Sequence, residues 1–292
     1  MGEYVITCCS TADWPKERLV QRKIHSVPFH VEIGGREYLD DAESLPLDSF
    51  YAMEREGAVP RSSQVNQEEY MAFWTPFLRE GLDVLHVTLS SGISGSFNTA
   101  CLAAEELSHE FPDRRVIVVD SLGASSGYGL LMEEIAEKRD CGLNLWQLSD
   151  YAEATKLHIQ HWFFASELNS LVRGGRISAV NGAVGTMLGI CPLMHVDRDG
   201  KLVPKAKIRT KRKVIDEMVR RMEEHADHGS GYSGPCAICH SDCADDAARV
   251  RDKVEERFPL LKGKIIMCRI GAVIGAHTGP STVALFFIGD ER

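Results

Sequence analysis

Hydroxyl side chains and glycines gather in three short stretches of the first half of the chain. These stretches read RSSQV at 61–65, LSSGISGSF at 89–97 and DSLGASSGYG at 120–129. Hydroxyls, together with the backbone N–H groups at the start of a helix, are donors that proteins use to hold an anion. Serine is also a common helix cap, which gives Ser94 and Ser96 an alternative role. Three such stretches in one half of the chain nevertheless favour an anion-binding site.

Two cationic or titratable side chains follow glycines in the second half. Arg176 comes after Gly174-Gly175, and His277 lies in the run IGAVIGAHTGPS at 270–281, with no acidic residue within five positions. The glycines predict a slim loop that carries His277 close to a ligand. The alternative is a tight turn in which the imidazole bonds to nearby backbone. This inventory is suited to holding a negative group rather than to breaking bonds.

Known catalytic and nucleotide-binding motifs do not explain these residues. The spacing G-x-x-x-x-G-K-[ST] is absent, no G-x-G-x-x-G follows a strand and opens a helix, and the stretch Gly92-Ile93-Ser94-Gly95 lacks the outer glycine spacing of G-x-S-x-G. Asp40, Asp41 and Asp120 fall on separate segments. We therefore expect no catalytic residue and no cofactor.

Nine cysteines without an export signal are expected to be free thiols. The run CAICHSDC at 236–243 has the C-x-x-C-H spacing of c-type haem attachment, and Cys236, Cys239, Cys243 and His240 form an alternative zinc set. We favour a buried strand at 236–242 that is followed by a helix, and we expect no metal.

Composition narrows the class of protein. The 292 residues are 44% hydrophobic and 26% charged, and the net charge of −9 argues against binding to nucleic acid. No apolar run is long enough to span a bilayer, and the first residues lack a secretory leader, so we expect a cytoplasmic location.

Strand-like and helix-like runs alternate along the first half, which predicts a parallel sheet covered by helices on both faces. Asn66 and Glu69 form a predicted capping pair for the helix 66–81, in which Pro76 is expected to cause a kink or an early end. The later chain predicts a hairpin at 191–208 and a helix at 210–228. We thus expect an α/β protein with an N-terminal domain at 1–160 and a smaller, mixed-strand domain at 161–292. The remaining predicted elements are strands at 3–8, 26–35, 82–90, 114–120, 157–165 and 281–290, and helices at 11–24, 46–57, 96–111, 127–140, 167–178 and 243–258.

Five ordered motifs resemble the DegV family of bacterial fatty-acid-binding proteins. They are RSSQV, LSSGISGSFNTA, VVDSLGASSGYGLL, LVRGGRIS and IGAVIGAHTGP, spread over nearly the whole length. The resemblance implies that one long-chain fatty acid lies between the two domains. It also implies an acyl-carrying subunit of fatty acid kinase, whose separate ATP-dependent subunit phosphorylates the carboxylate for phospholipid synthesis. The alternative is a stand-alone phosphotransferase or acyl-transfer enzyme that uses His277.

The resemblance assigns the fatty acid carboxylate to hydroxyls of the first two loops and to the late histidine. Carried onto this chain, these groups are Ser62, Ser91 with the Gly92 amide, and His277, with Arg176 nearby. The full predicted set is Ser62, Ser63, Ser91, Gly92, Ser94, Arg176, His277 and Thr278.

Two features fall outside this pattern. The family usually begins with a Thr-Asp-Ser-Thr-Ala-Asp run, whereas this chain has Cys8-Cys9 and one extra residue before Ser10, which bears on the shape of the pocket. The segment 198–213 carries eight cations and one acid, a local +7 that leaves −16 for the rest of the −9 chain. Its alternatives are a solvated surface and a contact with the kinase or an anionic membrane.

Overall fold

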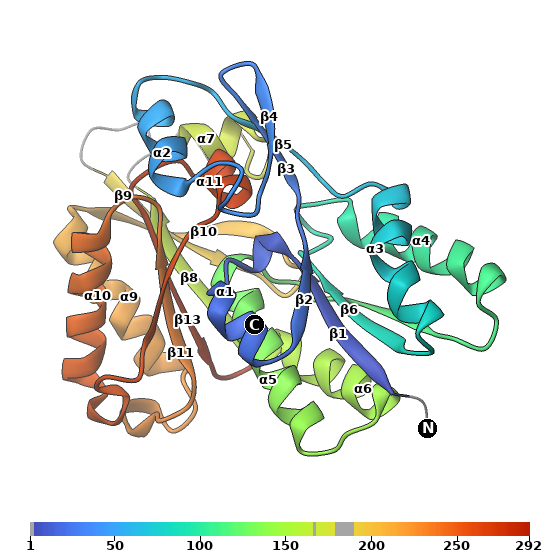
Figure 1. Cartoon of the computed structure of the whole chain (residues 1–292). Coiled ribbons are helices and arrows are strands. Elements are labelled where there is room, and N and C mark those ends of the chain that lie inside the picture. The colour runs from blue at the N-terminus through green and yellow to red at the C-terminus, as the bar shows by residue number, and fades with distance from the viewer. Residues whose placement is uncertain (1–2, 166–167, 179–189) are drawn as a thin grey trace.

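The computed structural model describes residues 3–165, 168–178 and 190–292, and it has the predicted α/β fold. An N-terminal parallel sheet and a C-terminal mixed sheet stand apart, with helices between and outside them (Figure 1). Within the described ranges, no helix has both the length and the apolar character that a membrane crossing requires.

The N-terminal sheet has the strand order β2-β1-β6-β7, and all of its strand pairs are parallel. Its strands are β1 (Tyr4–Cys9), β2 (Ile24–Val27), β6 (Asp83–Thr88) and β7 (Val116–Asp120). The serine-rich stretches 89–97 and 120–129 follow β6 and β7, so they meet at the carboxyl edge of this sheet, where open α/β sheets bind ligands.

A small antiparallel sheet lies beside the first one, in the order β4-β3-β5. Its strands are β3 (His30–Ile33), β4 (Arg36–Leu39) and β5 (Arg61–Ser63). The sequence predicted one strand over 26–35 and a loop at 61–65, and both predictions were wrong. The chain breaks between β2 and β3 at Pro28, and Ser62 pairs with Val31 across the sheet. Ser62 therefore belongs to a paired strand, and this pairing fixes the direction of its side chain.

The C-terminal sheet has the order β10-β9-β8-β13-β11-β12, in which only β11 and β12 pair in parallel. The predicted hairpin is confirmed as the antiparallel pair β9–β10, which turns at Asp199-Gly200. The six strands are β8 (Ile159–Ala165), β9 (Ile190–Val196), β10 (Leu202–Arg209), β11 (Cys236–His240), β12 (Ile266–Arg269) and β13 (Thr282–Ile288).

Helices form layers around the two large sheets. Contacts place α3 and α4 on one side of the N-terminal sheet, α5 between the two sheets, and α9 and α10 on the far side of the C-terminal sheet (Figure 1). The central position of α5 explains why most of its first three turns are buried. The helices are α1 (Lys16–Gln21), α2 (Leu47–Arg55), α3 (Gln67–Arg79), α4 (Ser96–Glu110), α5 (Ser125–Asp140), α6 (Leu145–Thr155), α7 (Asn169–Arg173), α9 (Lys211–His225), α10 (Ala244–Arg257) and α11 (Ala272–Thr278).

Helix α3 tests two sequence predictions. The capping box is confirmed, because Asn66 accepts from the backbone of Glu69 and the Glu69 carboxylate accepts from the backbone of Asn66. The early end at Pro76 is wrong, because α3 continues to Arg79. Buried Trp74 and Leu78 lie on either side of the proline, so packing holds the turn that proline weakens.

One continuous core joins the two sheets, since buried residues from β1, α5, β11 and β13 belong to the same cluster. The predicted boundary between residues 160 and 161 falls within β8, and the division into two domains stays a prediction. The first residue of the predicted helix 167–178 lies outside the described residues. Helix α7 ends at Arg173, so the prediction extended the helix too far, through the paired glycines.

Candidate ligand-binding site

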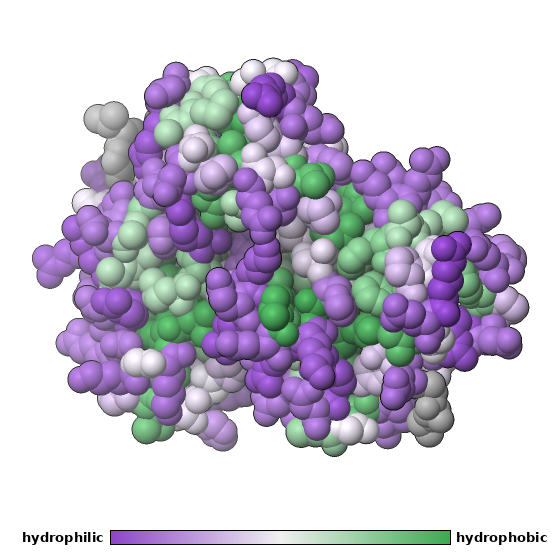
Figure 2. Space-filling view, viewed as in Figure 1, coloured by the Kyte–Doolittle hydropathy of each residue, from purple (hydrophilic) through white to green (hydrophobic). Residues whose placement is uncertain are grey.

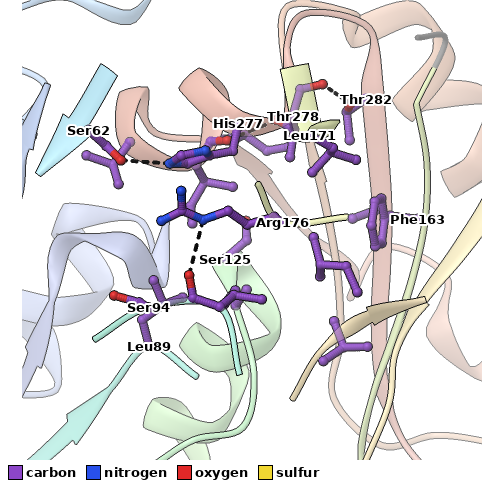
Figure 3. A pocket seen from close by; sticks show the side chains of 18 of the residues that line it. Ser62, Leu89, Ser94, Ser125, Phe163, Leu171, Arg176, His277, Thr278 and Thr282 are labelled. Atoms are coloured by element: carbon purple, nitrogen blue, oxygen red, sulfur yellow. Dashed lines mark hydrogen bonds between the residues drawn. The ribbon is translucent and has the colours of Figure 1, made fainter. Parts of the chain in front are cut away.

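A cavity of about 350 Å³ lies where α11, β5, β8 and the loops after β6 and β7 meet. Its volume falls at the lower end of the range for small-molecule sites. Polar side chains gather on one side, and apolar ones such as Phe163 and Leu171 line the other (Figure 3). Hydrophilic residues cover most of the face in Figure 2, where hydrophobic residues appear as separate patches. Phe163 and Leu171, on the apolar side of the cavity, are both buried.

The polar end is organised by a hydrogen bond between two predicted site residues. Ser62 Oγ lies 2.7 Å from His277 Nε2, although the two residues are 215 positions apart (Figure 3). Burial lowers the pKa of His277 to about 4, and the charges of Arg176 and Arg173 act in the same direction. The imidazole is therefore neutral at pH 7.

His277 does not lie in the predicted loop. It belongs to the last turn of α11, which is a helix despite Gly275 in its middle. A Cβ at position 275 would come within 2.6 Å of the Tyr51 hydroxyl, so this glycine permits close packing against α2. The glycine spacing was thus interpreted correctly as close backbone approach and wrongly as a break in regular structure.

The paired glycines before Arg176 help to place two side chains, His277 and Arg176. A Cβ at Gly174 would lie 2.3 Å from His277 Nδ1, so only glycine leaves room for the ring. Gly175 adopts a φ of +73°, which favours glycine and turns the chain so that Arg176 enters the cavity.

Arg176 brings a positive charge under the Ser62–His277 pair (Figure 3). Its Nε donates to the Ile93 carbonyl at 3.1 Å and its guanidinium also donates to the Gly174 carbonyl. Among the described residues, no carboxylate forms an ion pair with it. Burial lowers the pKa of Arg176, which still leaves a strongly basic group. An uncompensated guanidinium beside neutral donors is an environment for an anion.

Ser94 combines the two roles that its position allowed. Its hydroxyl accepts from the N–H of Ser96 at the start of α4 and also lines the cavity. A hydroxyl that accepts one bond keeps its own proton for a ligand oxygen. Ser63 and Thr278 line the cavity as well, and Thr278 Oγ1 already donates to the Ile274 carbonyl.

Ser91 and Gly92, by contrast, do not line the cavity. The Ser91 amide donates to Asp120, and the Gly92 amide donates to Ser90 Oγ at 3.1 Å, so both groups are already bonded within the fold. A Cβ at Gly92 would lie 2.5 Å from the Asp199 carbonyl. This part of the loop therefore packs against the β9–β10 turn.

The sequence prediction missed several cavity residues. Ser125 belongs to a stretch that was noted as hydroxyl-rich, but its side chain was not assigned to the site. His161 is buried on β8, where Nδ1 bonds to the Ile159 carbonyl and Nε2 accepts from the Ala124 amide. Burial lowers the pKa of His161 well below its usual range, so the ring is neutral. Apolar lining carries no sequence signal of its own, because it resembles ordinary core; it includes Phe29, Leu89, Ile93, Phe163, Ile274 and Phe286.

Six of the nine cysteines are buried, and none of the nine lines the cavity. All nine are free thiols, as predicted. Cys8 and Cys9 do not line the cavity, and burial raises the pKa of both to about 12. Cys236 and Cys239 point to opposite faces of β11, one into each core cluster, so they cannot share a metal ion. Within residues 3–165, 168–178 and 190–292, no group of side chains is arranged to hold one.

Comparison with known proteins gives a consistent result. A family model described as "Uncharacterised protein, DegV family" matches residues 4–290. A DegV domain-containing protein of Clostridium perfringens is 32% identical over 293 residues, covering 100% of this chain and 99% of that protein. The structure of DegV, a fatty acid binding protein from Bacillus subtilis, superimposes with a TM-score of 0.85 at 26% identity, covering 99% of this chain and 100% of that one.

A further structure shows likeness of fold alone. It is the fatty acid kinase B3 protein of Streptococcus pneumoniae loaded with linoleic acid, with a TM-score of 0.84 at 21% identity, covering 99% of this chain and 100% of that one.

The family match extends over nearly the whole length, and the five motifs lie around one cavity or directly beside it. The chain therefore belongs to the DegV family.

Proposed function

We propose that this protein binds one long-chain fatty acid, with its carboxylate at the polar end of the cavity and its tail among the apolar side chains. The observation that carries the proposal is the Ser62–His277 pair above Arg176, at one end of a cavity whose lining is mostly apolar. Relatives with the same fold are described as fatty acid binding proteins, which supports this ligand class.

The tail supplies most of the affinity in this proposal. A palmitate-like chain buries about 14 methylenes at about 0.8 kcal/mol each, or roughly 11 kcal/mol before the costs of ordering and association. Each hydrogen bond to the charged head adds about 1.5–3 kcal/mol. The apolar wall thus retains the ligand, and the polar end decides which way round it lies.

The head group is held by donors of three kinds. Ser62 and Ser94 offer hydroxyl protons, Arg176 offers a guanidinium, and His277 offers an imidazole that becomes a stronger donor on protonation. We assign the carboxylate contact in the second loop to Ser94, which lines the cavity, in place of Ser91 and Gly92, which do not. The Gly92 amide is in addition already bonded to Ser90 Oγ.

We propose further that the protein acts as a carrier, and that a separate ATP-dependent kinase subunit converts the carboxylate into an acyl phosphate for phospholipid synthesis. The common fold with a fatty acid kinase B protein supports this role. A stand-alone enzyme would need a carboxylate to orient His277. Its Nδ1 is buried, and no partner for it exists among the described residues.

The basic segment 198–213 suits an anionic partner. Lys205, Lys207 and Arg209 are exposed along β10, the edge strand of the C-terminal sheet, and the described carboxylates form no ion pair with them. We propose that this segment makes transient contact with an anionic membrane. Co-sedimentation with vesicles that contain phosphatidylglycerol is expected to fall with added salt, and binding that does not depend on salt would contradict the proposal.

Native mass spectrometry of the purified protein tests the ligand directly. We expect an adduct with the mass of a long-chain fatty acid that disappears after solvent extraction and returns when palmitate is added. Adding purified fatty acid kinase catalytic subunit with ATP then tests the carrier role, with acyl phosphate as the expected product. A protein that neither carries nor takes up fatty acid would refute the proposal.

A further inference from the structure

The helix that carries His277 is short, and the N–H groups at its start donate to two buried carboxylates. Helix α11 has seven residues, and an isolated helix of that length does not hold its shape in water. The Gly271 N–H donates to Asp13 Oδ1 at 2.9 Å, and the Ala272 N–H donates to Asp40 Oδ1 at 3.0 Å. Asp13 is 9% exposed and Asp40 is 8% exposed. Both come from N-terminal segments that lie more than 230 positions earlier.

The second oxygen of each carboxylate is linked to another part of the cavity lining, directly for Asp13 and through Ser10 for Asp40. Asp13 Oδ2 accepts from the Ser125 hydroxyl, and Ser125 lines the cavity. Asp40 Oδ2 accepts from the Ser10 hydroxyl at 2.8 Å, and Ser10 Oγ in turn accepts from the backbone of Phe29, another cavity residue. Each carboxylate therefore joins the start of α11 to one other part of the lining.

The approach of the backbone to these carboxylates is close enough to exclude a side chain. A Cβ at Gly271 would lie 2.6 Å from Asp13 Oδ1 and 3.3 Å from Asp40 Oδ1. His277 follows Ala272 by five residues, or about 7.5 Å along a helix axis. The two carboxylates thus contact the start of the helix and do not contact the imidazole, which remains available to the ligand.

We infer that Asp13 and Asp40 are positioning residues, which fix α11 so that His277 reaches the ligand carboxylate together with Ser62. This inference rests on the proposed function. A purely structural role would change the stability of the fold and the binding of any lipid alike. A positioning role changes the binding of the charged head group selectively.

The experiment compares palmitate with methyl palmitate, which has the same tail and no charge. For the full-length protein, the ratio of the two dissociation constants measures head-group recognition. We expect Asp40→Ala to lower this preference for the acid by about tenfold, the value of one charge-assisted hydrogen bond, and Asp40→Asn to lower it less because one oxygen remains. Asp41→Ala is the matched control, because Asp41 bonds only to its own loop at Glu43 and Ser44.

The outcomes separate the two proposals. If the wild-type protein binds neither lipid, the proposed function fails. If it prefers the acid and both Asp40 variants keep that preference within about twofold, the positioning inference fails alone. Should Asp40→Ala not fold, Asp40→Asn decides the matter by the same ratio, with a loss of more than about twofold expected.

A second measurement needs no ligand. We expect the NMR signals of the His277 imidazole to shift in Asp13→Asn and in Asp40→Asn, and to stay in place in Asp41→Ala.

A double-mutant cycle with the two lipids tests the same contact. In this cycle, His277→Ala should remove most of the effect of Asp40→Ala on the acid preference, because both changes act on one contact. Independent, additive effects would overturn the inference.

Discussion

The protonation of His277 gives the proposed site a dependence on pH that can be worked out in advance. In the free protein, burial and two arginine charges hold the pKa of His277 at about 4. A ligand carboxylate beside the ring favours the imidazolium, and an opposite charge at this range raises a pKa by about 1–3. The pKa of His277 in the complex is then about 5–7. Binding at a pH between the free and the bound value takes up a proton.

The sign of the effect follows from the higher pKa of the ring in the complex. Because binding raises the pKa, the extra affinity is complete below the free value of about 4 and is lost as the pH rises through the bound value. A pKa that differs by one between the free and bound protein corresponds to about 1.4 kcal/mol, or tenfold in affinity. A bound pKa of about 6 gives about fourfold tighter binding at pH 5.5 than at pH 7.5. The fatty acid carboxyl itself, with a pKa of about 4–5, stays mostly ionised over this range.

Isothermal titration calorimetry in buffers with different ionisation enthalpies measures the proton uptake. We expect a fractional uptake for the wild-type protein at pH 6 and none for His277→Gln, which keeps a hydrogen-bond donor but cannot titrate. Fluorescent fatty acid displacement at pH 5.5 and 7.5 gives the affinities. Equal pH dependence in the two proteins, or no proton uptake by the wild type, would refute the assignment of His277 to the carboxylate.

Four substitutions test the remaining geometry. Ser94→Ala is expected to weaken palmitate binding in equilibrium dialysis by about tenfold, whereas Ser91→Ala stays within about twofold, and equal losses would contradict our placement of the head group. Gly174→Ala should displace the His277 ring and lower the preference for palmitate over its methyl ester, because the new Cβ would lie 2.3 Å from Nδ1; an unchanged preference would show that the ring can relax. Ala284→Phe should fill the tail space and abolish the fatty acid adduct in native mass spectra, and a retained adduct would place the tail elsewhere.

Much of the architecture could be predicted because it depends on local patterns. The helix α9 buries Val214, Ile215, Met218, Val219 and Met222, which is the apolar stripe that the sequence shows. The capping box at Asn66 is equally local, since its partners are three residues apart.

The predictions that failed depend on contacts between distant segments. Gly275 looks like a helix breaker until Tyr51 is placed against it, and Pro76 looks like a helix end until buried neighbours are seen on both sides. Ser91 and Gly92 have the composition of an anion loop, and their amides are used by Asp120 and Ser90. Spacing along the chain shows which groups are available, whereas tertiary packing decides which of them remain free to bind a ligand.

The positions of the buried acids follow the same reasoning. A carboxylate against His277 Nδ1 would orient the ring as in a hydrolase, but its charge would also repel a ligand carboxylate on the other side. In this protein Nδ1 faces Gly174, and Asp13 and Asp40 stand at the far end of α11. There they hold the helix through its first N–H groups, about 7.5 Å along the axis from the histidine. Burial raises the pKa of both acids, and the charge of Asp40 raises that of Asp13 further, so the fold keeps them at a free-energy cost. Placing the two acids away from the head group leaves the proposed carboxylate site without a competing negative charge beside His277, as the proposed carrier role requires.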